Sequence, residues 1–363
     1  NISYNERIKT LIGYIKFRVR NFLDVLEARQ KQAAGSTDKK FEQYRSQGIE
    51  FLARYFSEWL IVDVVAFYME VFRNKSSFKM LKNKKYDLIF ITEYSLGILG
   101  EGEVEREDLA PLCYLKYLLD GLSHITKFEH IVVDEAQDLN ALEFTILRLL
   151  SRNSSFTIMG DMSQGINSYR SIDSWQVLMK DVFSDVKSIY REVNHSYRSA
   201  REIVECFNSV MPSGHSLAIP VYEIGQKPVI EQVVTNQDAI RAIVEAVKKF
   251  KNLECKSIGI ITKLESESLI IYKALDSDHF AIDGINLITS ETLTYQGGIS
   301  ILPVTLAKGL EFDGVIIWNA SSINFRDNSL DHKLLYVALS RALYYLHILY
   351  RNNLTPLLKK YTE

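Results

Sequence analysis

Residues 130–169 constrain the fold more than any other part of the chain. They read HIVVDEAQDLNALEFTILRLLSRNSSFTIMGDMSQGINSY. A short apolar run is followed by a pair of carboxylates and then by residues with a helical period. A second apolar run ends at Gly160 and Asp161, and Gln164 comes three residues later. This pattern predicts strand, loop, helix, strand and loop, which is typical of an α/β fold with a buried parallel sheet.

The acidic pair Asp134 and Glu135 directly follows the first predicted strand. In open α/β sheets, ligands bind outside the carboxyl ends of the strands, so these carboxylates and Gln164 lie where a ligand is expected. The pair suits a nucleoside triphosphatase, because Asp134 can hold Mg²⁺ while Glu135 polarises the attacking water and Gln164 senses a γ-phosphate. The simpler alternative is that both acids only lie at the end of a strand and cap the next helix.

Composition sets broad limits on the class of protein. The chain has 363 residues, 47% hydrophobic and 24% charged, which is ordinary for a globular protein of two or three domains. No apolar run is long enough to cross a bilayer, so no membrane partner is expected. Cys113, Cys206 and Cys255 lie far apart without a CxxC pair, which favours a reducing, cytoplasmic location over a zinc or disulfide framework.

The first part of the chain has a helical period. Apolar residues recur at steps of three and four over residues 2–72, with a break at residues 35–38, and predict two helices in an antiparallel arm. Basic residues are frequent on the arm; they either contact nucleic acid or, more simply, form a solvated face with the acids among them. Residues 87–92 predict a short strand, glycines at 97, 100 and 102 predict a flexible turn, and residues 107–121 predict a helix.

Strand and helix signals alternate through the second half and predict a second parallel sheet flanked by helices. The expected strands are residues 186–190, 229–234, 257–262, 299–303, 315–318 and 345–350, and the expected helices are residues 175–183, 239–250, 266–275 and 334–343. Ser199 is a candidate cap for a helix over the residues that follow it. Lys308, Gly309 and Glu311 precede a predicted strand, and Arg341 falls on the last predicted helix. Taken singly, Lys308 is more simply a solvated loop lysine and Arg341 a surface or salt-bridging arginine.

Five motifs together carry a family resemblance. VVDEAQD, GDMSQGI, SYRS, AKGLEFDGVII and YVALSRA, in this order, closely resemble the later motifs of superfamily 1 helicases of the UvrD/Rep kind. The stretches REDLAPLCYLKYLLDG and PVTLAKGLEFDGVI look like the HelD (helicase IV-like) branch in particular. The resemblance covers residues 105–350 and leaves the arm largely outside it.

The resemblance implies an α/β fold of two RecA-like domains of the P-loop NTPase type, with ATP bound between them. Residues 105–190 would be the remainder of an incomplete first domain, residues 191–363 the second domain, and residues 1–104 a helical arm inserted into the first.

The same resemblance assigns roles to individual residues. Asp134 would bind Mg²⁺ together with Glu135, which is also the expected catalytic base, and Gln164 would contact the γ-phosphate. In the second domain Tyr197 would stack on the adenine, Arg198 and Arg341 would reach the phosphates as arginine fingers, and Glu311 would approach the ribose. The remaining nucleotide-binding residues would be Gln137, Lys308 and Gly309.

The chain departs from the family pattern at three places. No stretch matches GxxxxGK followed by Ser or Thr, so this chain alone is expected to bind ATP poorly and to be inactive. Asn167 stands where many relatives have an aromatic residue, and Pro303 and Thr305 stand in place of a Thr and a His that serve DNA, which argues against processive unwinding. The interval from Arg198 to Thr305 is too short for the large domain that many relatives insert there.

These observations favour the C-terminal part of a HelD-like ATPase that uses ATP and Mg²⁺ to release RNA polymerase from nucleic acid. Its expected partners are RNA polymerase, on which the arm would dock, and nucleic acid through weak, sequence-independent contacts. Two alternatives stay open: a fragment of an ordinary UvrD-like DNA helicase or translocase, and a non-catalytic binding module that has lost its P-loop.

Overall fold

The chain forms two compact units. Unit 1 comprises residues 1–131 and 141–157, and unit 2 comprises residues 132–140 and 158–363. The computed structural model describes residues 3–35, 38–59, 61–74, 88–122, 125–167, 171–172, 174–212, 216–222, 225–276, 282, 284–292 and 297–362. In these ranges no helix is both long and apolar enough to cross a membrane.

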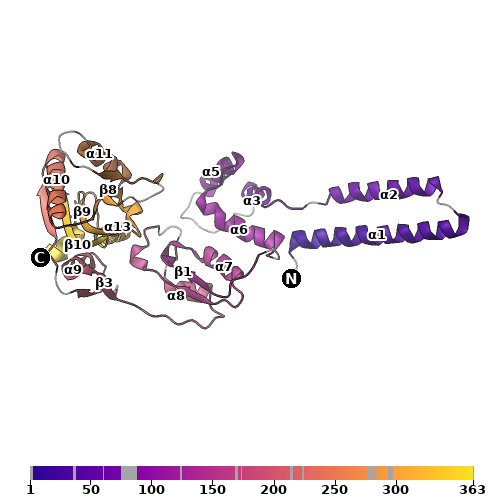
Figure 1. Ribbon diagram of the computed structural model, residues 1–363, viewed down its shortest axis with the longest axis horizontal. Helices are drawn as coiled ribbons and strands as arrows, with labels where there is room; N and C mark the ends of the chain where they lie inside the picture. The colour runs from indigo at the N-terminus through magenta and orange to yellow at the C-terminus, as the bar shows by residue number, and fades with distance from the viewer. Residues whose placement is uncertain are drawn as a thin grey trace. The chain divides into compact units, whose positions relative to one another are not determined.

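Unit 1 is mainly helical. Its helices are α1 (Tyr4–Ala34), α2 (Lys39–Ser57), α3 (Val64–Arg73), α5 (Leu88–Gly100), α6 (Arg106–Asp120) and α7 (Ala141–Leu150). Helices α1 and α2 run side by side in opposite directions, which confirms the predicted antiparallel pair (Figure 1). The second helix was predicted too long, because α2 ends at Ser57 and α3 is a separate helix. Helix α1 begins with a capping box between Ser3 and Glu6 and ends at Gly35, whose φ of 71° is favourable for glycine.

A buried asparagine holds the base of this hairpin. The side chain of Asn5 donates to the carbonyl of Val62 at 3.1 Å and to the Asp120 carboxylate at 2.7 Å, and it accepts from the Val62 N–H at 3.0 Å. Since Asn5 is 1% exposed, these bonds satisfy a polar group that would be costly to leave unpaired. They tie the start of α1 to the end of α6.

The expectation of a short strand at residues 87–92 is wrong. Residues 88–92 form the start of α5, while residue 87 lies outside the described residues. Apolar and β-branched side chains in LIFIT suit a strand or a buried helix, and here the run continues to Gly100 and contacts α3. Gly97 and Gly100 therefore lie within a helix, and only Gly102 adopts the positive φ of a turn. Helix α6 confirms the prediction for residues 107–121.

Unit 2 is built on a six-stranded sheet in which every neighbouring pair is parallel, as predicted. Its strands are β5 (Val229–Val233), β6 (Ser257–Thr262), β7 (Ile285–Leu287), β8 (Gly298–Pro303), β9 (Phe312–Ile317) and β10 (Ala342–Arg351). Their spatial order is β5-β10-β9-β6-β8-β7. The central strands are almost wholly buried, which explains why their sequences are continuous apolar runs.

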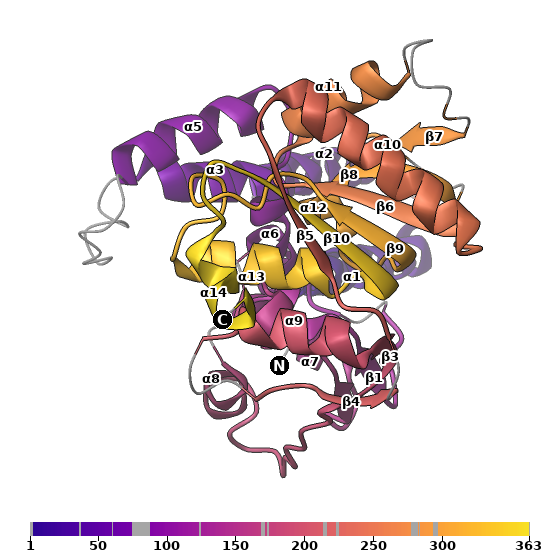
Figure 2. The ribbon, with the colours of Figure 1, turned by 90° about the vertical axis from the view of Figure 1, so that its left-hand side faces the viewer.

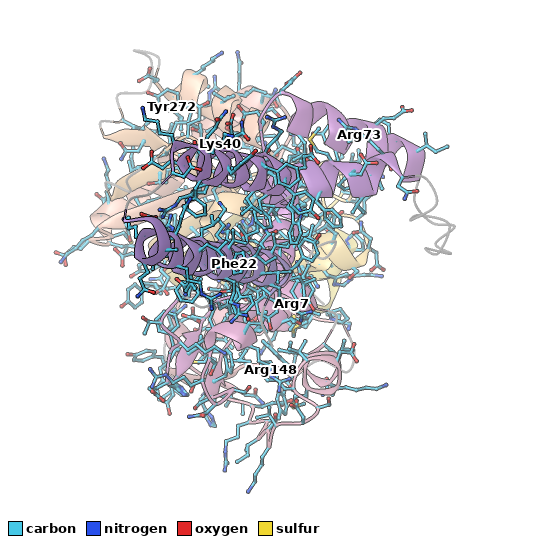
Figure 3. The ribbon with its side chains drawn as sticks, turned by 90° about the vertical axis from the view of Figure 1, so that its right-hand side faces the viewer. Arg7, Phe22, Lys40, Arg73, Arg148 and Tyr272 are labelled. Carbon is cyan, nitrogen blue, oxygen red and sulfur yellow. The ribbon has the colours of Figure 1, made fainter. Side chains whose placement is uncertain are left out.

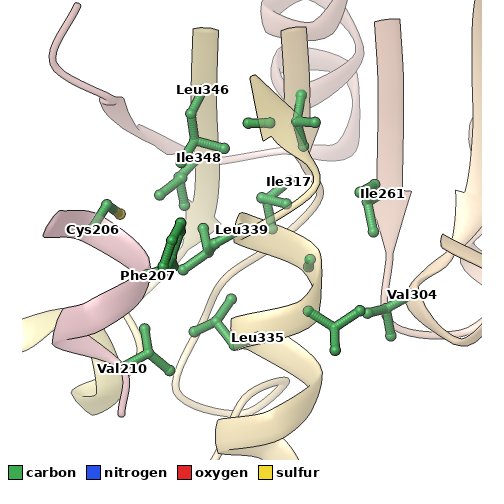
Figure 4. Close-up of a cluster of buried hydrophobic side chains, with 14 of the residues drawn as sticks. Cys206, Phe207, Val210, Ile261, Val304, Ile317, Leu335, Leu339, Leu346 and Ile348 are labelled. Carbon is green, nitrogen blue, oxygen red and sulfur yellow. The ribbon is translucent and has the colours of Figure 1, made fainter. Parts of the chain in front are cut away.

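Helices cover both faces of this sheet. Its helices are α9 (Arg201–Ser209), α10 (Asn236–Asn252), α11 (Glu265–Leu275), α12 (Val304–Ala307) and α13 (Ser329–Leu339). Figure 2 shows α10 and α11 on one side of the sheet and α9 and α13 on the other. One core joins α9 and α13 to side chains such as Ile261 and Ile317 (Figure 4), and the other joins α10 and α11 to Ile260 and Ile316. Alternate residues of one strand thus enter opposite cores.

Further elements of unit 2 are α8 (Trp175–Asp181), β3 (His195–Ala200) and β4 (Ile219–Tyr222), with η4 (Pro356–Leu358) and α14 (Lys359–Thr362) at the end. Residues 186–190 form no strand, and the strand β3 was not predicted. Ser199 does not cap α9; it lies on β3 and donates to the Ala342 carbonyl at 2.8 Å. Helix α13 ends at Leu339, so Arg341 lies in the turn before β10 and not on a helix.

Candidate active site

The acidic pair directly follows β1 (Ile131–Val133), as predicted. Asp134 accepts the backbone N–H of Glu135 at 2.8 Å, and Glu135 has a φ of 50°, which is unusual for a residue with a side chain. Both side chains are exposed. Glu135 leads into the short 3₁₀ turn η1 (Ala136–Asp138) without capping it through its side chain, which weakens the alternative that this acid only caps a helix.

Gln137 links the acidic motif to the loop after β2 (Phe156–Ile158). It is fully buried, its amide nitrogen donates to the Glu135 carboxylate, and its oxygen accepts the Asp161 N–H at 2.9 Å. A Cβ at Gly160 would lie 2.3 Å from that oxygen and 3.1 Å from the backbone nitrogen of Ala136. Glycine is therefore needed at position 160 for the two loops to approach this closely.

Asp161 organises the 3₁₀ turn η2 (Met162–Gln164). Its carboxylate accepts the Ser163 N–H at 2.9 Å and the Gln164 side-chain N–H at 2.9 Å. The hydroxyl of Tyr336, on α13, donates to the same carboxylate at 3.3 Å. Burial raises the pKa of Tyr336, and the charge of Asp161 and this hydrogen bond raise it further, so the tyrosine is a hydrogen-bond donor at neutral pH.

Arg341 is directed at Gln164. It is 3% exposed and donates to the Gln164 side-chain oxygen at 2.9 Å, to the Val337 carbonyl at 3.1 Å and to the Leu310 carbonyl at 3.3 Å. Burial lowers the pKa of Arg341, as does the charge of Arg198. The simpler expectation of a surface or salt-bridging arginine is wrong, because Arg341 is buried and pairs with no carboxylate in the described part of the chain.

Glu311 pairs with a different arginine. Its carboxylate lies 2.7 Å from the guanidinium of Arg198, and that guanidinium is more than half exposed. Tyr197, next to it on β3, is 68% exposed and contacts the ring of His195. The exposed tyrosine ring and the guanidinium are thus open to a ligand.

Lys308 is not a solvated loop lysine. Its ammonium lies 2.7 Å from the Asp138 carboxylate and 3.3 Å from that of Glu135, and its side chain is 12% exposed. Gly309 follows with a φ of 78°, a conformation favourable for glycine. The motif before β9 therefore meets the motif after β1 through side-chain contacts.

The structure brings most of the candidate residues together. Glu135 joins Gln137 and Lys308, Gln164 joins Arg341, and Arg198 joins Glu311. Both Asp134 and Tyr197 are exposed: among the described residues, the Asp134 side chain bonds only the backbone N–H of Glu135, and Tyr197 forms no hydrogen bond to this set. Sequence reasoning missed the roles of Asp161, Tyr336 and Asp138. A carboxylate soon after a short apolar strand was a usable signal for Asp161, whereas nothing in the local sequence singled out Tyr336.

The carboxylates of this site could bind Mg²⁺ only together with water and a substrate phosphate. Across the described ranges, no three His, Cys, Asp or Glu side chains are grouped so that they could hold a metal ion alone. Mg²⁺ is usually bound through one or two carboxylates, with water and substrate phosphate completing its octahedron. The exposed carboxylates of Asp134 and Glu135 match this requirement.

Two family models match the chain. The UvrD/REP helicase N-terminal domain matches residues 107–181, and the UvrD-like helicase C-terminal domain matches residues 298–349. These segments include the acidic motif, the Gln164 loop, Lys308 and Arg341.

Relatives agree with the family models. A provisionally named ATP-dependent DNA helicase of Acanthamoeba polyphaga mimivirus is 26% identical over 93% of this chain and 48% of its own length. The ATP-dependent DNA helicase Rep of Buchnera aphidicola is 28% identical over 41% of this chain and 24% of its own length. PcrA of Staphylococcus epidermidis is 33% identical over 23% of this chain and 12% of its own length. The chain spans less than half the length of each of these relatives, and two of its segments are similar to UvrD/REP-type helicase domains.

Proposed function

We propose that this chain supplies most of the catalytic groups of an ATP-driven DNA helicase or translocase of the UvrD kind. One observation carries the proposal: the Arg341 guanidinium donates to Gln164 at 2.9 Å although 177 positions separate the two residues. A buried cation aimed at a polar loop that follows a sheet strand suits the phosphate chain of a nucleotide.

The acidic motif would act at the bond that is cleaved. Asp134 would hold Mg²⁺, whose chemistry is to neutralise charge on the phosphate oxygens. Glu135 would accept a proton from the attacking water, and its geometry is held by Gln137. Gln164 would report the γ-phosphate, because its amide is already oriented by Asp161 and Arg341.

The second set of residues would bind the rest of the nucleotide. Arg198 and Arg341 would place guanidinium charge beside the phosphates, where a planar fork can donate two hydrogen bonds at once. Tyr197 would offer its exposed ring to the adenine, and Glu311 would accept from a ribose hydroxyl. Lys308 and Gly309 would close the site next to Glu135.

The finer alternatives rest on sequence resemblance. The relatives described above are DNA helicases by name, which favours the UvrD-like reading over release of RNA polymerase. The HelD branch, an RNA polymerase partner, the two RecA-like domains and inactivity of the chain alone stay predictions. A binding module without catalysis is disfavoured because the catalytic set is kept in mutual contact.

Nucleotide hydrolysis by the whole protein tests the proposal. Turnover of ATP with Mg²⁺ is measured on the unmodified protein, on Arg341→Ala and on the control Arg241→Ala, which removes an exposed arginine of α10. We expect the first variant to lose turnover and the control to retain it. Equal turnover in all three proteins would reject the site, and absence of turnover in the unmodified protein would reject the function.

A further inference from the structure

The α1–α2 hairpin of unit 1 carries an exposed face that the nucleotide site does not use. Residues 4, 7, 11, 14, 18, 22, 25 and 29 recur at steps of three and four and so lie along one side of α1. On α2 the corresponding series is residues 40, 44, 47, 51 and 55. We call these two series the aromatic face.

Both series lie on the same side of the hairpin. In each helix, almost every member is followed at the next position by a less exposed residue: Tyr14 precedes Ile15, and Phe51 precedes Leu52. Since the two helices contact each other, these less exposed positions mark their inner sides. One residue is a rotation of about 100°, so each series is offset from its inner side by the same angle and in the same sense. The two helices run in opposite directions (Figure 1), and this shared offset therefore points both series toward one side of the hairpin.

The aromatic face presents flat rings to solvent. Phe22, which is labelled on α1 in Figure 3, is 63% exposed, and Tyr44 and Phe51 are 70% and 64% exposed. The rings of Phe51 and Tyr55 are stacked, with centroids 6.3 Å apart and planes 14° from parallel. So many exposed rings on one side of a hairpin exceed the scattered apolar residues of an ordinary surface.

Charge is divided between the two sides of the hairpin. The aromatic face contains Arg18, Arg29 and Lys40, which are exposed and form no ion pair with any residue that the structure describes, and it contains no acidic residue. On the opposite side Asp24 and Glu27 bind Arg45, and Glu27 also binds Lys31, while Lys9 and Arg20 are exposed and form no ion pair with any described residue. The aromatic face therefore has unpaired cations among its rings and no acid beside them.

The whole hairpin is cationic in an acidic chain. Helix α1 has seven basic and three acidic residues and α2 has four and two, which gives the helices a net charge of +6, whereas the full chain has −2. Exposed rings with unpaired cations between them fit a strand whose bases are free to stack and whose phosphates are negative. A duplex offers its phosphates but keeps its base faces covered.

We infer that the aromatic face of the α1–α2 hairpin binds single-stranded nucleic acid. Rings such as Phe22 and Phe51 stack on bases, and Arg18, Arg29 and Lys40 contact phosphates. This inference rests on the hairpin alone and does not depend on the proposed ATP site. An acidic protein surface is the competing partner, and the experiment separates the two.

Fluorescence anisotropy of a labelled 20-nucleotide oligothymidylate with the full chain tests the inference. Phe22→Ala with Phe51→Ala should weaken binding by at least about thirtyfold, the lower end of the loss expected for two stacking rings. The matched control, Phe17→Ala with Ile49→Ala, removes one exposed apolar side chain from each helix off the aromatic face and should leave affinity within about twofold.

A charge-matched pair tests the phosphate contacts. Arg18→Ala with Arg29→Ala should weaken binding and reduce the dependence of affinity on salt by about 1.4 in log–log slope, since each phosphate contact on a single strand contributes about 0.7. Lys9→Ala with Arg20→Ala removes the same charge from the opposite side and should have a smaller effect on both quantities.

Three results would overturn the inference. If the unmodified chain bound no single strand at low salt, a protein partner would be left as the occupant of the face. If both variants of a matched pair lost affinity equally, only net charge would matter. If a duplex of the same length bound as tightly as the single strand, stacking on bases would be excluded. Circular dichroism of each variant confirms that the helices are intact.

Discussion

Lys308 places its ammonium 2.7 Å from the carboxylate of Asp138, although the two residues lie 170 positions apart in the sequence. The same ammonium lies 3.3 Å from Glu135, the candidate base. The other oxygen of Asp138 is buried and accepts no hydrogen bond in the described part of the chain, so the lysine supplies most of that carboxylate's stabilisation. This ion pair fixes the two loops that border the proposed site.

Lys308→Ala should destabilise the protein because it leaves the Asp138 carboxylate largely buried without a partner. In a double-mutant cycle with Asp138→Ala, we expect a coupling free energy of about 1–3 kcal/mol. Urea unfolding of the four proteins gives this quantity. A coupling near zero would mean that the pair contributes nothing to holding the loops together.

Gly160→Ala should lower both stability and ATP turnover. The new Cβ would lie 2.3 Å from the Gln137 oxygen, so Gln137 must move and lose its bond to the Asp161 N–H. We expect a loss of about 1–3 kcal/mol, as for overpacking of a tight site. Gly13→Ala, in open space on α1, is the control and should be neutral or stabilising. Similar melting temperatures for the two variants would contradict the tight approach at Gly160.

Arg341→Ala should reduce ATP turnover of the whole protein by about a thousandfold, the low end for an arginine finger. It should also lower the melting temperature, because the carbonyls of Val337 and Leu310 lose buried donors. Arg341→Lys should restore little turnover, since an ammonium cannot reproduce the planar fork. Steady-state rates beside thermal melts separate the two effects, and a variant with a lowered melting point but normal turnover would make Arg341 purely structural.

Glu135→Gln should abolish hydrolysis while nucleotide binding persists. The substitution removes the proposed base but keeps a side chain of the same size beside Gln137, and it leaves Asp134 to hold Mg²⁺. Binding of a fluorescent ATP analogue and phosphate release are measured on the same protein preparation. If binding falls as steeply as hydrolysis, the proposed division of roles between the two acids is incorrect.

Asp331 should make unit 2 sensitive to acid. Burial disfavours its charged form, but hydrogen bonds from Lys263, the Arg326 N–H and Asn328 outweigh burial and lower the pKa of Asp331 below its usual 3.8. A lowered folded pKa stabilises the fold above about pH 4, and this contribution is lost as the pH falls below that value. Asp331→Asn should lower the melting temperature at pH 7. The difference in melting temperature between this variant and the unmodified protein should be smaller at pH 3. An unchanged difference at both pH values would contradict this assignment.

The second sheet was largely predictable, because its strands are buried on both faces. Strand β6 falls at residues 257–262 as expected, and β5, β8, β9 and β10 overlap their predicted ranges. Continuous apolar runs bounded by turns carry this signal in the local sequence. The same signal failed for α5, since LIFIT is equally apolar in a helix that packs on α3.

Contacts between residues far apart in the sequence could not be predicted from local sequence patterns. The apolar residues around Arg341 continue past Leu339, so the helix appeared to include the arginine, but the later ones belong to the buried strand β10. The bond from Arg341 to Gln164 joins the turn before β10 to the loop after β2, strands of two different sheets, and spacing along the chain does not specify such a contact. Family resemblance indicated which residues should meet, and only coordinates supply the partners that hold them, such as Tyr336 with Asp161.

The strand order has a consequence for how the protein is made. Strand β10 is synthesised last among the strands, yet it pairs with both β5 and β9 inside the sheet. On a ribosome, β5 therefore has no neighbour in the sheet until residues near 351 have emerged, and its backbone N–H and C=O groups lack their β10 partners until then. The α1–α2 hairpin, whose contacts are local, can form long before. Nascent chains stalled before residue 342 should thus display a folded hairpin beside an unfinished sheet that chaperones can bind.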